Sequence, residues 1–420
     1  MFDKLAVSLA LRFNGEVING DALQLYKGLP IITNKLSEFE RRDVPHHLLG
    51  CIDLEQPSWT VRDYSQHAKT IVEDIRSRGK LPIIVGGTHY YVQSIVSPKS
   101  IMANETGNLE SSEGEKAKWP ILNASTERIL AELQKVDPEM AERWHPRDRR
   151  KIQRSLEIWL QTGRRPSEIY LEQKNSNSDP QVQGLRSDDA SFLSYDTLVL
   201  WTHAPISELY PRLEDRVDKM VSNGLLTEAE TMYTFVQSNR AQGLEVDESR
   251  GIFVAIGYKE FLPVFGADNP SENIRSACIE RTKIATRQYA KRQTRWIRYK
   301  LLPSVAETGS LDRTFLLDAT SLTEWQTNVA DTAACLTDCF LRASGLPAPK
   351  SLSDVAHNML VIEDKPTMQS RHCEACEKTL MTEALWKLHL SSKGHRRSTQ
   401  PKIDWGALYP KTADPGPNET

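Results

Sequence analysis

Long apolar segments are absent from this chain of 420 residues, and no stretch approaches 18 uninterrupted apolar side chains. A transmembrane helix needs about 20 such residues, so the sequence predicts no membrane span. The first residues, Met1 to Lys4, carry neither the apolar core of a secretory signal nor the Arg-rich composition of a transit peptide. No membrane association is therefore expected.

Cysteines are few and net charge is low. Four of the six cysteines are scattered, two form a tight pair, and the formal net charge is −3. Scattered cysteines do not make a disulfide framework and are typical of a reducing compartment. Cys335 and Cys339, four apart in a predicted helix, are interpreted as small buried apolar residues. The low net charge means that any nucleic-acid surface must be a local basic patch.

The order of the apolar segments predicts an α/β fold. Residues 3–14 and 61–78 have helical spacing, and a glycine follows each. Residues 16–19, 81–85 and 195–201 are predicted strands, and the continuously apolar run at 81–85 is typical of a buried parallel strand. Helices are also predicted at 126–136, at 148–162 and over most of 206–300. Strands and helices that alternate with short links indicate a parallel sheet.

Changes in composition predict the domain boundaries. Residues 97–118 and 174–190 are polar, and residues 341–370 are rich in Pro and Ser. The predicted parts are an α/β catalytic core with a helical portion (1–96 and 195–340), an insertion and helical region (97–194), a linker (341–370), a finger (371–400) and a flexible tail (401–420).

A metal-ligand pattern near the C-terminus is the most specific local signal. Cys373 and Cys376 are followed at finger-like spacing by His389 and His395. Two thiolates and two imidazoles complete a closed tetrahedral zinc site, so structural Zn²⁺ is predicted. Leucines at 380, 385 and 388 are expected to supply the small core of this finger.

Basic residues surround the finger, and they leave its role open. The residues are Lys387, Lys393, Arg396 and Arg397. Positive charge on a rigid module suits an RNA backbone. The spacing of the metal ligands does not show what the finger binds, however. A finger that binds protein, or one that only stabilises the fold, is the alternative.

Several blocks, in the same order along the chain, resemble the tRNA dimethylallyltransferase family. The blocks are Asp21-Ala22-Leu23-Gln24-Leu25-Tyr26, Val44-Pro45-His46-His47-Leu48-Leu49, Val85-Gly86-Gly87-Thr88-His89-Tyr90-Tyr91, Ala255-Ile256-Gly257-Tyr258-Lys259-Glu260 and Ala290-Lys291-Arg292-Gln293 followed by Arg295-Trp296. They cover about residues 3–300, and a zinc finger after them is similar to the eukaryotic branch. The resemblance implies a P-loop-kinase-like parallel sheet core with a helical tRNA-binding region.

The resemblance also implies a reaction and its residues. A dimethylallyl group passes from dimethylallyl diphosphate to N6 of an adenosine beside the tRNA anticodon. Asp21 is implied as the base for the weakly nucleophilic amine. Thr88, Arg216 and a magnesium ion are implied near the diphosphate, where charge grows as it leaves.

Each of these residues also has a structural interpretation. Asp21 could be a turn or cap residue after a strand, and Thr88 could cap a helix after two glycines. Arg216 could belong to a salt-bridged helix face with Arg212, Asp218 and Lys219.

Two basic clusters are candidates for the tRNA surface, residues 281–300 and the group Arg147, Arg149, Arg150, Lys151 and Arg154. Residues 281–300 contain eight Lys or Arg and no acid, with Tyr289, Trp296 and Tyr299 interleaved. Phosphates attract the charge, and an unstacked base stacks on aromatic rings. A solvated helix face is the alternative. With the family blocks, the predicted tRNA-binding residues are Asp21, Ala22, Leu23, Gln24, Arg150, Lys151, Ile152, Gln153, Arg154, Lys291, Arg292, Gln293 and Arg295.

The family's phosphate-binding loop is missing. The resemblance implies a strand and a Gly-rich loop ending Gly-Lys-Ser/Thr before the first helix, and no such motif occurs. Without a central strand its neighbours keep unpaired backbone groups. We therefore expect an N-terminally truncated chain whose targeting information is missing, so cytoplasm, mitochondrion and nucleus are all compatible. Ala22 also stands where the family usually has a hydroxyl residue.

Two other functions compete with prenyl transfer. A tRNA-binding protein without catalysis would keep the RNA surface and the finger but not the phosphate loop. A kinase of small nucleotides would share the sheet, but it would need neither the basic aromatic segment nor the finger. The sequence does not determine the oligomeric state, and a monomer is the simpler expectation.

Overall fold

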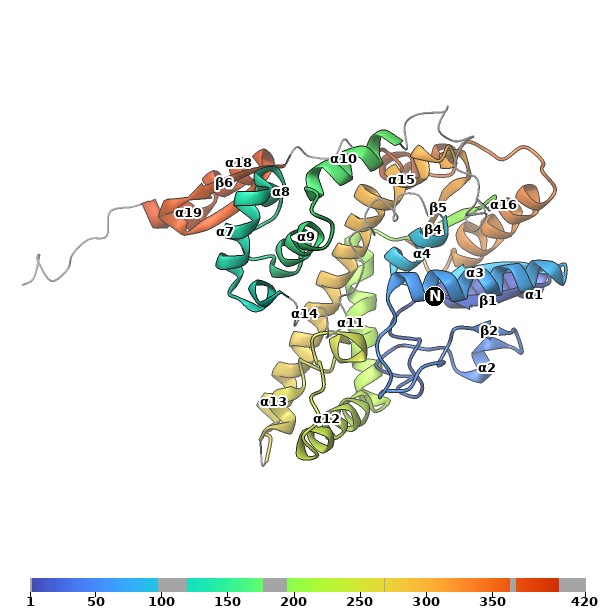
Figure 1. Ribbon diagram of the computed structural model, residues 1–420. Coiled ribbons are helices and arrows are strands. Elements are labelled where there is room, and N and C mark those ends of the chain that lie inside the picture. Colours follow the sequence, from blue (N-terminus) through green and yellow to red (C-terminus); the bar gives the residue numbers. More distant parts are fainter. Residues whose placement is uncertain (1, 97–118, 177–194, 268, 363–367, 400–420) are drawn as a thin grey trace, which may run out of the picture. The chain divides into compact units, whose positions relative to one another are not determined.

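The structure is a computed structural model that describes residues 2–96, 119–176, 195–267, 269–362 and 368–399 (Figure 1). The chain divides into two compact units, Met1–Met102 with Ser187–Glu363 and Ala103–Arg186 with Asp364–Thr420. The polar segment predicted at 97–118 and the tail predicted at 401–420 lie outside the described residues. No helix in the described ranges is both long and apolar enough to span a bilayer.

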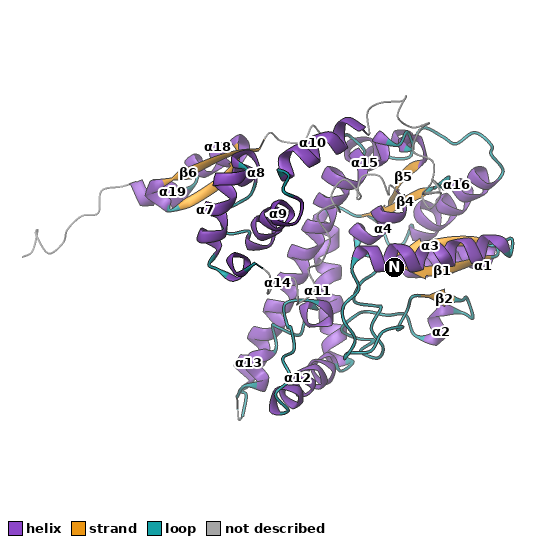
Figure 2. Ribbon diagram, viewed as in Figure 1, coloured by secondary structure: helices purple, strands orange, loops and turns teal. Residues whose placement is uncertain are grey.

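Helices make up most of both units (Figure 2). The first unit contains α1 (Phe2–Arg12), β1 (Gly15–Asn19), α2 (Glu38–Arg41), β2 (His46–His47), α3 (Val61–Ser77), β3 (Leu81–Val85), α4 (His89–Val96), β4 (Val199–His203), α11 (Ile206–Ser222), α12 (Leu225–Ala241), α13 (Leu262–Phe265), α14 (Glu272–Trp296), α15 (Leu302–Glu307), β5 (Thr314–Asp318), α16 (Thr332–Leu341) and α17 (Asp354–Met359). The second contains α7 (Thr126–Val136), α8 (Pro138–Arg143), α9 (Arg149–Thr162), α10 (Pro166–Ser176), β6 (Met368–Cys373), β7 (Lys378–Thr382), α18 (Glu383–Ser391) and α19 (Lys393–Thr399).

Parallel strands form the core of the first unit and confirm the predicted α/β class. β1 lies between β2 and β3 and runs parallel to both, with Val17 opposite His46 and Ile83. β4 and β5 form a separate parallel pair. Within the described ranges, β3 and β4 each have one hydrogen-bonded neighbour.

A shared apolar cluster covers both sheets. Leu5 and Leu9 of α1 pack with Phe315 of β5, and Ile83 of β3 and Leu200 of β4 pack against the same cluster. Helical spacing in α1 therefore buries one face against strands from both sheets.

α3 shows how local sequence sets the position of a helix. Thr60 and Asp63 form a reciprocal capping box at its start. Its buried residues recur three or four positions apart: Val61, Tyr64, Ala68, Val72 and Ile75. This face packs on the same core as Ile18 of β1, which places the carboxyl end of β1 above a rigid layer.

Three predictions about the first unit need correction. The third strand begins at Val199, because residues 195–198 are not in a strand. Part of the predicted linker is folded, since Ala356 and Leu360 of the α17 region are buried in a core cluster. Cys335 is exposed and Cys339 is half-buried, so they are not core residues. The other face of α16, with Ala333, Ala334, Leu336 and Thr337, is the buried one.

The second unit has its own core between α7 and α9. Leu122, Ile129, Leu133, Ile152 and Leu156 are buried together. Asp148 caps α9 by accepting from the amide of Lys151 at 3.4 Å, and Gly163 ends it with a φ of 68°. Both ends of this helix were predicted.

A buried carboxylate ties β1 to the end of α3. Glu16 is 2% exposed, and it accepts from Nζ of Lys80 at 2.7 Å, from Nη2 of Arg78 at 2.8 Å and contacts Nε2 of His47 at 2.8 Å. The hydrogen bonds from Arg78, followed by those from Lys80 and His47, hold the pKa of Glu16 well below its ordinary value.

We predict that Glu16→Gln lowers the free energy of unfolding by about 2 kcal/mol, because charge-assisted bonds to half-exposed cations are lost. The depressed pKa means that the carboxylate stabilises the fold above the unfolded pKa of about 4.3, and that this stability is lost as pH falls. Chemical denaturation at several pH values checks this. Glu280→Gln is the control, since that side chain is 63% exposed and should change stability by less than about 0.5 kcal/mol. Equal effects of the two substitutions would contradict the prediction.

Candidate active site and metal centre

Asp21 lies in a tight turn at the carboxyl end of β1. Asn19 holds this turn: its Nδ2 donates to the carbonyl oxygens of Asp21 at 2.9 Å and Leu48 at 2.8 Å, and its Oδ1 accepts from the amide of Asp21 at 2.9 Å. One oxygen of the Asp21 carboxylate accepts from the amide of Leu23 at 2.9 Å. The carboxylate is therefore fixed by local bonds, as in an Asx turn.

The environment of Asp21 makes it a stronger base than an ordinary aspartate. Burial raises its pKa, although hydrogen bonds from the amides of Leu23, Gln24 and Gly87 act in the opposite direction. A carboxylate whose pKa is raised toward neutral pH is better suited to accept a proton during a reaction.

The turn after β3 meets the Asp21 turn directly. The hydroxyl of Thr88 accepts from the amide of Ala22 at 2.9 Å, and the amide of Thr88 donates to the carbonyl of Gly20 at 3.2 Å. A Cβ on Gly86 would lie 2.1 Å from the carbonyl carbon of Gly20, so only glycine fits there. Asp21 and Thr88, predicted separately from two blocks, are thus brought together.

Arg216 on α11 is not part of a salt-bridged helix face. Lys219 pairs with Asp215 at 2.6 Å, and Arg212 donates to the carbonyl of Ala319 at 2.7 Å. Within the described ranges, Arg216 makes no ion pair or hydrogen bond. Its pKa is lowered by surrounding protein and raised by the charges of Asp3 and Tyr289, so its guanidinium lies near both residues. It is exposed to solvent and remains a cation available to an anionic ligand.

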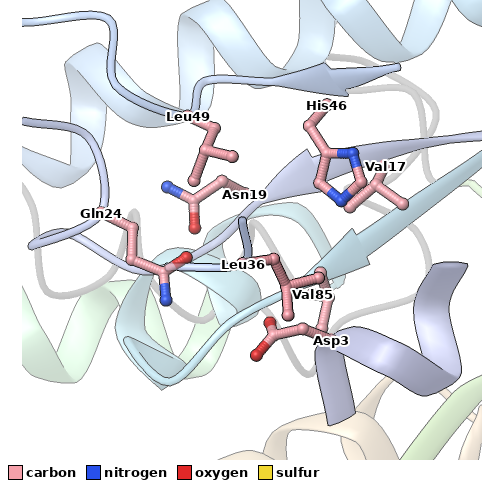
Figure 3. Close-up of a pocket in the computed structure, with 8 residues that line it drawn as sticks. All are labelled: Asp3, Val17, Asn19, Gln24, Leu36, His46, Leu49 and Val85. Atoms are coloured by element: carbon pink, nitrogen blue, oxygen red, sulfur yellow. The ribbon is translucent and has the colours of Figure 1, made fainter. Parts of the chain in front are cut away.

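A second buried carboxylate, Asp3 of α1, was missed by the sequence analysis. It is 8% exposed and lines a small cavity of about 10 Å³ with Asn19, Gln24 and Val85 (Figure 3). Burial and then the negative charge of Asp21 raise its pKa to about 6, while Arg216 lowers it. An acidic residue in the first turn of a helix is ordinary, so no sequence signal distinguished Asp3.

The carboxyl-terminal half of α14 covers this site. The hydroxyl of Tyr289 donates to the carbonyl of Gly87 at 3.4 Å, and Nε1 of Trp296 donates to Oε1 of Gln93 at 3.3 Å. Burial, and next the charge of Asp21, raises the pKa of Tyr289. His89 is half-buried, and the loss of solvent around it lowers its pKa to about 4 and keeps it neutral. Two of the three aromatic residues predicted to stack on bases therefore anchor α14 to the site.

The basic residues of α14 differ in their pairing. Lys283 pairs with Asp218 at 2.8 Å, and Arg287 pairs with Glu214, so acids of α11 neutralise these two cations. Further along the helix, Lys291, Arg292 and Arg295 are exposed. Arg292 and Arg295 lie over the rings of Tyr289 and Tyr299 at 5.8 and 5.9 Å. This part of α14 keeps the predicted tRNA-binding cations accessible.

Some predicted tRNA-binding side chains are already engaged inside the protein. Ile152 is fully buried in the α7–α9 core, so its side chain is not free to touch RNA. Arg154 donates to the buried Glu157 at 2.6 Å. The side-chain Nε2 of Gln24 donates to the backbone carbonyls of Thr33 and Asn34, both at 3.2 Å. Arg150 and Lys151 are exposed.

Four ligand atoms converge in the finger. Cys373, Cys376, His389 and His395 place one ligand atom each within 4.8 Å of one another, so together they could hold a metal ion. The sulfurs of Cys373 and Cys376 lie 3.5 and 3.4 Å from Nδ1 of His395. Tetrahedral zinc, with bonds of about 2.3 Å to sulfur and 2.0–2.1 Å to nitrogen, separates such atoms by roughly 3.5 Å. Nε2 of His389 is buried without a hydrogen-bond partner, as a metal ligand would be.

The predicted core of the finger is wrong in part. Leu385 and Leu388 of α18 are 42% and 67% exposed, and Leu380 is half-buried. Trp386 is the half-buried apolar residue of this helix, with its ring 6.1 Å from that of His389. Two turns of helix against a two-stranded hairpin cover only one face, which leaves the leucines outside.

The close contact between the backbones of Gly86 and Gly20 predicts that a larger residue at position 86 destabilises the fold. Gly86→Ala should lower the free energy of unfolding by more than about 2 kcal/mol, because Cβ overlaps the backbone of Gly20 rather than a flexible side chain. Gly266→Ala is the control, since the nearest atom to its Cβ is 3.6 Å away. Thermal or urea denaturation measures both, and equal stabilities would show that the two turns can separate.

Comparison with known proteins supports one family. The IPP transferase family model matches residues 24–300. The chain is 36% identical to a tRNA dimethylallyltransferase of Schizosaccharomyces pombe, covering 95% of this chain and 92% of that protein. It is 35% identical to a tRNA dimethylallyltransferase of Saccharomyces cerevisiae, covering 94% and 88%. Its structure is similar to a crystal structure of a eukaryotic dimethylallyltransferase acting on tRNA, with a TM-score of 0.74, 33% identity and coverage of 94% and 92%.

Proposed function

This chain belongs to the IPP transferase family, and we propose that it transfers a dimethylallyl group from dimethylallyl diphosphate to N6 of an adenosine beside the anticodon of tRNA. The observation that carries the proposal is the position of Asp21. Its half-buried carboxylate is fixed by the Asn19 turn, and the adjacent backbone is bonded to the Thr88 turn. The positive charge of Lys35 also acts on this carboxylate.

The proposed reaction is a displacement at the allylic carbon. The adenine N6 forms a bond to C1 of the dimethylallyl group while the bond from C1 to the diphosphate oxygen breaks. The conjugated amine is weakly nucleophilic, so it must lose a proton, and the Asp21 carboxylate accepts it. The raised pKa of Asp21 favours this transfer.

The leaving diphosphate needs positive charge and hydrogen-bond donors. Arg216 supplies an unpaired guanidinium, and the hydroxyl of Thr88 can still donate while it accepts from the amide of Ala22. With no Gly-Lys-Ser/Thr loop in the 420 residues, these are the groups of this chain proposed to bind the diphosphate.

A magnesium ion is part of the proposal. Asp3 is a buried carboxylate close enough to Asp21 for that charge to raise its pKa, and hard cations prefer oxygen ligands of this kind. Asp3 would hold the ion, and Mg²⁺ would neutralise charge on the diphosphate. We also propose that the four finger ligands bind Zn²⁺, and that exposed Lys387, Lys393 and Arg396 favour contact with RNA.

A second candidate function is tRNA binding without catalysis. The exposed cations of α14, Lys291, Arg292 and Arg295, favour it, because they suit an RNA backbone whether or not transfer occurs. Two measurements distinguish the two candidate functions: transfer of a labelled dimethylallyl group to tRNA, and binding of tRNA.

Asp21→Asn tests the proposed base. Incubation of wild-type protein with unmodified tRNA, Mg²⁺ and radiolabelled dimethylallyl diphosphate should move label into the tRNA. The variant should lose at least about 100-fold in kcat, because an amide does not accept the proton, while its Kd for tRNA should stay within about threefold. The acidic limb of the wild-type rate should lie at higher pH than the pKa of an ordinary aspartate, in line with the raised pKa of Asp21. Binding without transfer by the wild type would support the second candidate instead.

Metal analysis tests the finger. Purified protein should contain one zinc per chain, and Cys376→Ser should lose it, because three remaining ligands leave the site open. Cys335→Ser is the matched control, since that thiol is exposed and outside the ligand group. Loss of zinc from both variants, or from neither, would contradict the assignment.

A further inference from the structure

Glu228 of α12 has no role in the proposed chemistry, yet its carboxylate bonds to the loop that follows Asp21. Its two oxygens each accept from the amide of Ile31 at 3.0 Å, and Oε2 also accepts from the amide of Ile32 at 2.7 Å. An acid near the start of a helix usually stabilises that helix. Glu228 instead bonds to a segment that lies 197 residues earlier in the chain.

The bonds from Glu228 complete a single helical turn in this loop. The amide of Asn34 donates to the carbonyl of Ile31 at 3.0 Å, and the amide of Lys35 donates to the carbonyl of Pro30 at 2.9 Å. Amides at the start of such a turn have no carbonyl partner within it. The carboxylate of Glu228 supplies that partner from another element, and bonds to a charged acceptor are stronger than neutral ones.

Gln24 connects the capped turn to the proposed base. Its Nε2 donates to the carbonyls of Thr33 and Asn34, both at 3.2 Å, and its backbone amide donates to the carboxylate of Asp21. Gln24 is 8% exposed, so water does not compete well for these bonds. A continuous set of hydrogen bonds and one turn of backbone therefore join Glu228 to Asp21.

Lys35 provides a second connection between Glu228 and Asp21. Its Nζ donates to the carbonyls of Tyr26 and Gly28, which closes the loop on itself. Burial lowers the pKa of Lys35 to about 8, while the negative charge of Glu228 raises it. The positive charge of Lys35 in turn acts on Asp21. Glu228 thus helps to keep Lys35 charged.

We propose that Glu228 is a positioning residue for Asp21, and that it acts by holding the loop at residues 22–35 in one conformation. The proposal rests on the proposed function for the role of Asp21 as the base. Glu228 touches no reacting group itself. A displacement of about 1 Å at a catalytic group can cost about 100-fold in rate, even when the substitution is far from the chemistry.

The test is Glu228→Ala, assayed by transfer of the labelled dimethylallyl group to tRNA. Its kcat should fall about 10- to 30-fold, while the KM for dimethylallyl diphosphate should stay within about threefold, because Arg216 on α11 is not moved. Glu228→Gln should show a smaller loss, because its side-chain oxygen still accepts from the amides. Glu230→Ala is the matched control: Glu230 is exposed on the same helix, and its kcat should stay within about twofold. Melting temperatures establish that each variant is folded during the assay.

A double-mutant cycle separates positioning from a general loss of structure. In the Asp21→Asn background, Glu228→Ala should lower kcat by less than about twofold, because the group that Glu228 positions is no longer a base. Equal kcat values for Glu228→Ala and Glu230→Ala would overturn the proposal. A loss in the Asp21→Asn background as large as in the wild type would overturn it as well, since a merely structural effect acts in both backgrounds.

Hydrogen exchange of the amides at residues 22–35 measures the loop without any catalysis. Exchange should be at least about tenfold faster in Glu228→Ala than in the wild type and unchanged in Glu230→Ala, because the amides of Ile31 and Ile32 lose their acceptor. Unchanged exchange in Glu228→Ala would refute the holding of the loop. A wild-type chain that transfers no label would refute the proposed reaction instead, and the exchange rates would still show whether Glu228 holds the loop.

Discussion

The close contact between the carboxyl ends of β1 and β3 is the constraint on which the rest of the site depends. At that point the backbone of Gly86 approaches Gly20 so closely that no side chain fits between them. The amide of Thr88 then bonds to the carbonyl of Gly20, and its hydroxyl accepts from the amide of Ala22. The carboxylate of Asp21 is held between these turns. A parallel sheet brings such turns to one edge, which is where ligands bind in α/β proteins.

Carboxylates at the two ends of β1 are balanced by positive charge to different degrees. Glu16, at the opposite end of β1, is fully compensated by a histidine, an arginine and a lysine, which is a structural arrangement. Asp3 and Asp21 are less compensated, and burial raises the pKa of both. Arg216 is left without a partner in the described part of the chain. Charged side chains without a full set of partners, close to solvent, are typical of a site in which a bound ligand supplies the missing charge.

Periodicity and cap residues were sufficient to predict much of the fold. The helices predicted at 61–78 and 148–162 occupy 61–77 and 149–162, and each is followed closely by the glycine that marked its end. The cysteine and histidine group, Asp21 and Thr88 were also predicted, because each belongs to a compact motif. A local sequence motif does not show which side chains are buried, or which side chains from different helices and strands pair with one another. Asp3 looks like an ordinary first-turn acid, and Cys335 lies on the exposed face of a helix whose other face is buried.

The sequence also could not show which basic residues of the predicted RNA surface are accessible. Arg154 and Ile152 belong to a basic segment, but Glu157 and the α7–α9 core engage them. Along α14, acids of α11 pair with Lys283 and Arg287 but leave the later cations Lys291, Arg292 and Arg295 exposed. Only the folded chain shows this difference.

Nucleoside analysis of the product tests the central claim most directly. Unmodified tRNA would be incubated with this chain, Mg²⁺ and dimethylallyl diphosphate, digested, and its nucleosides identified by mass spectrometry. The account predicts that N6-dimethylallyladenosine forms, that it maps to the adenosine beside the anticodon, and that Asp21→Asn abolishes it. Unchanged nucleosides in tRNA that the protein nevertheless binds would contradict the account and leave an RNA-binding protein without this catalysis.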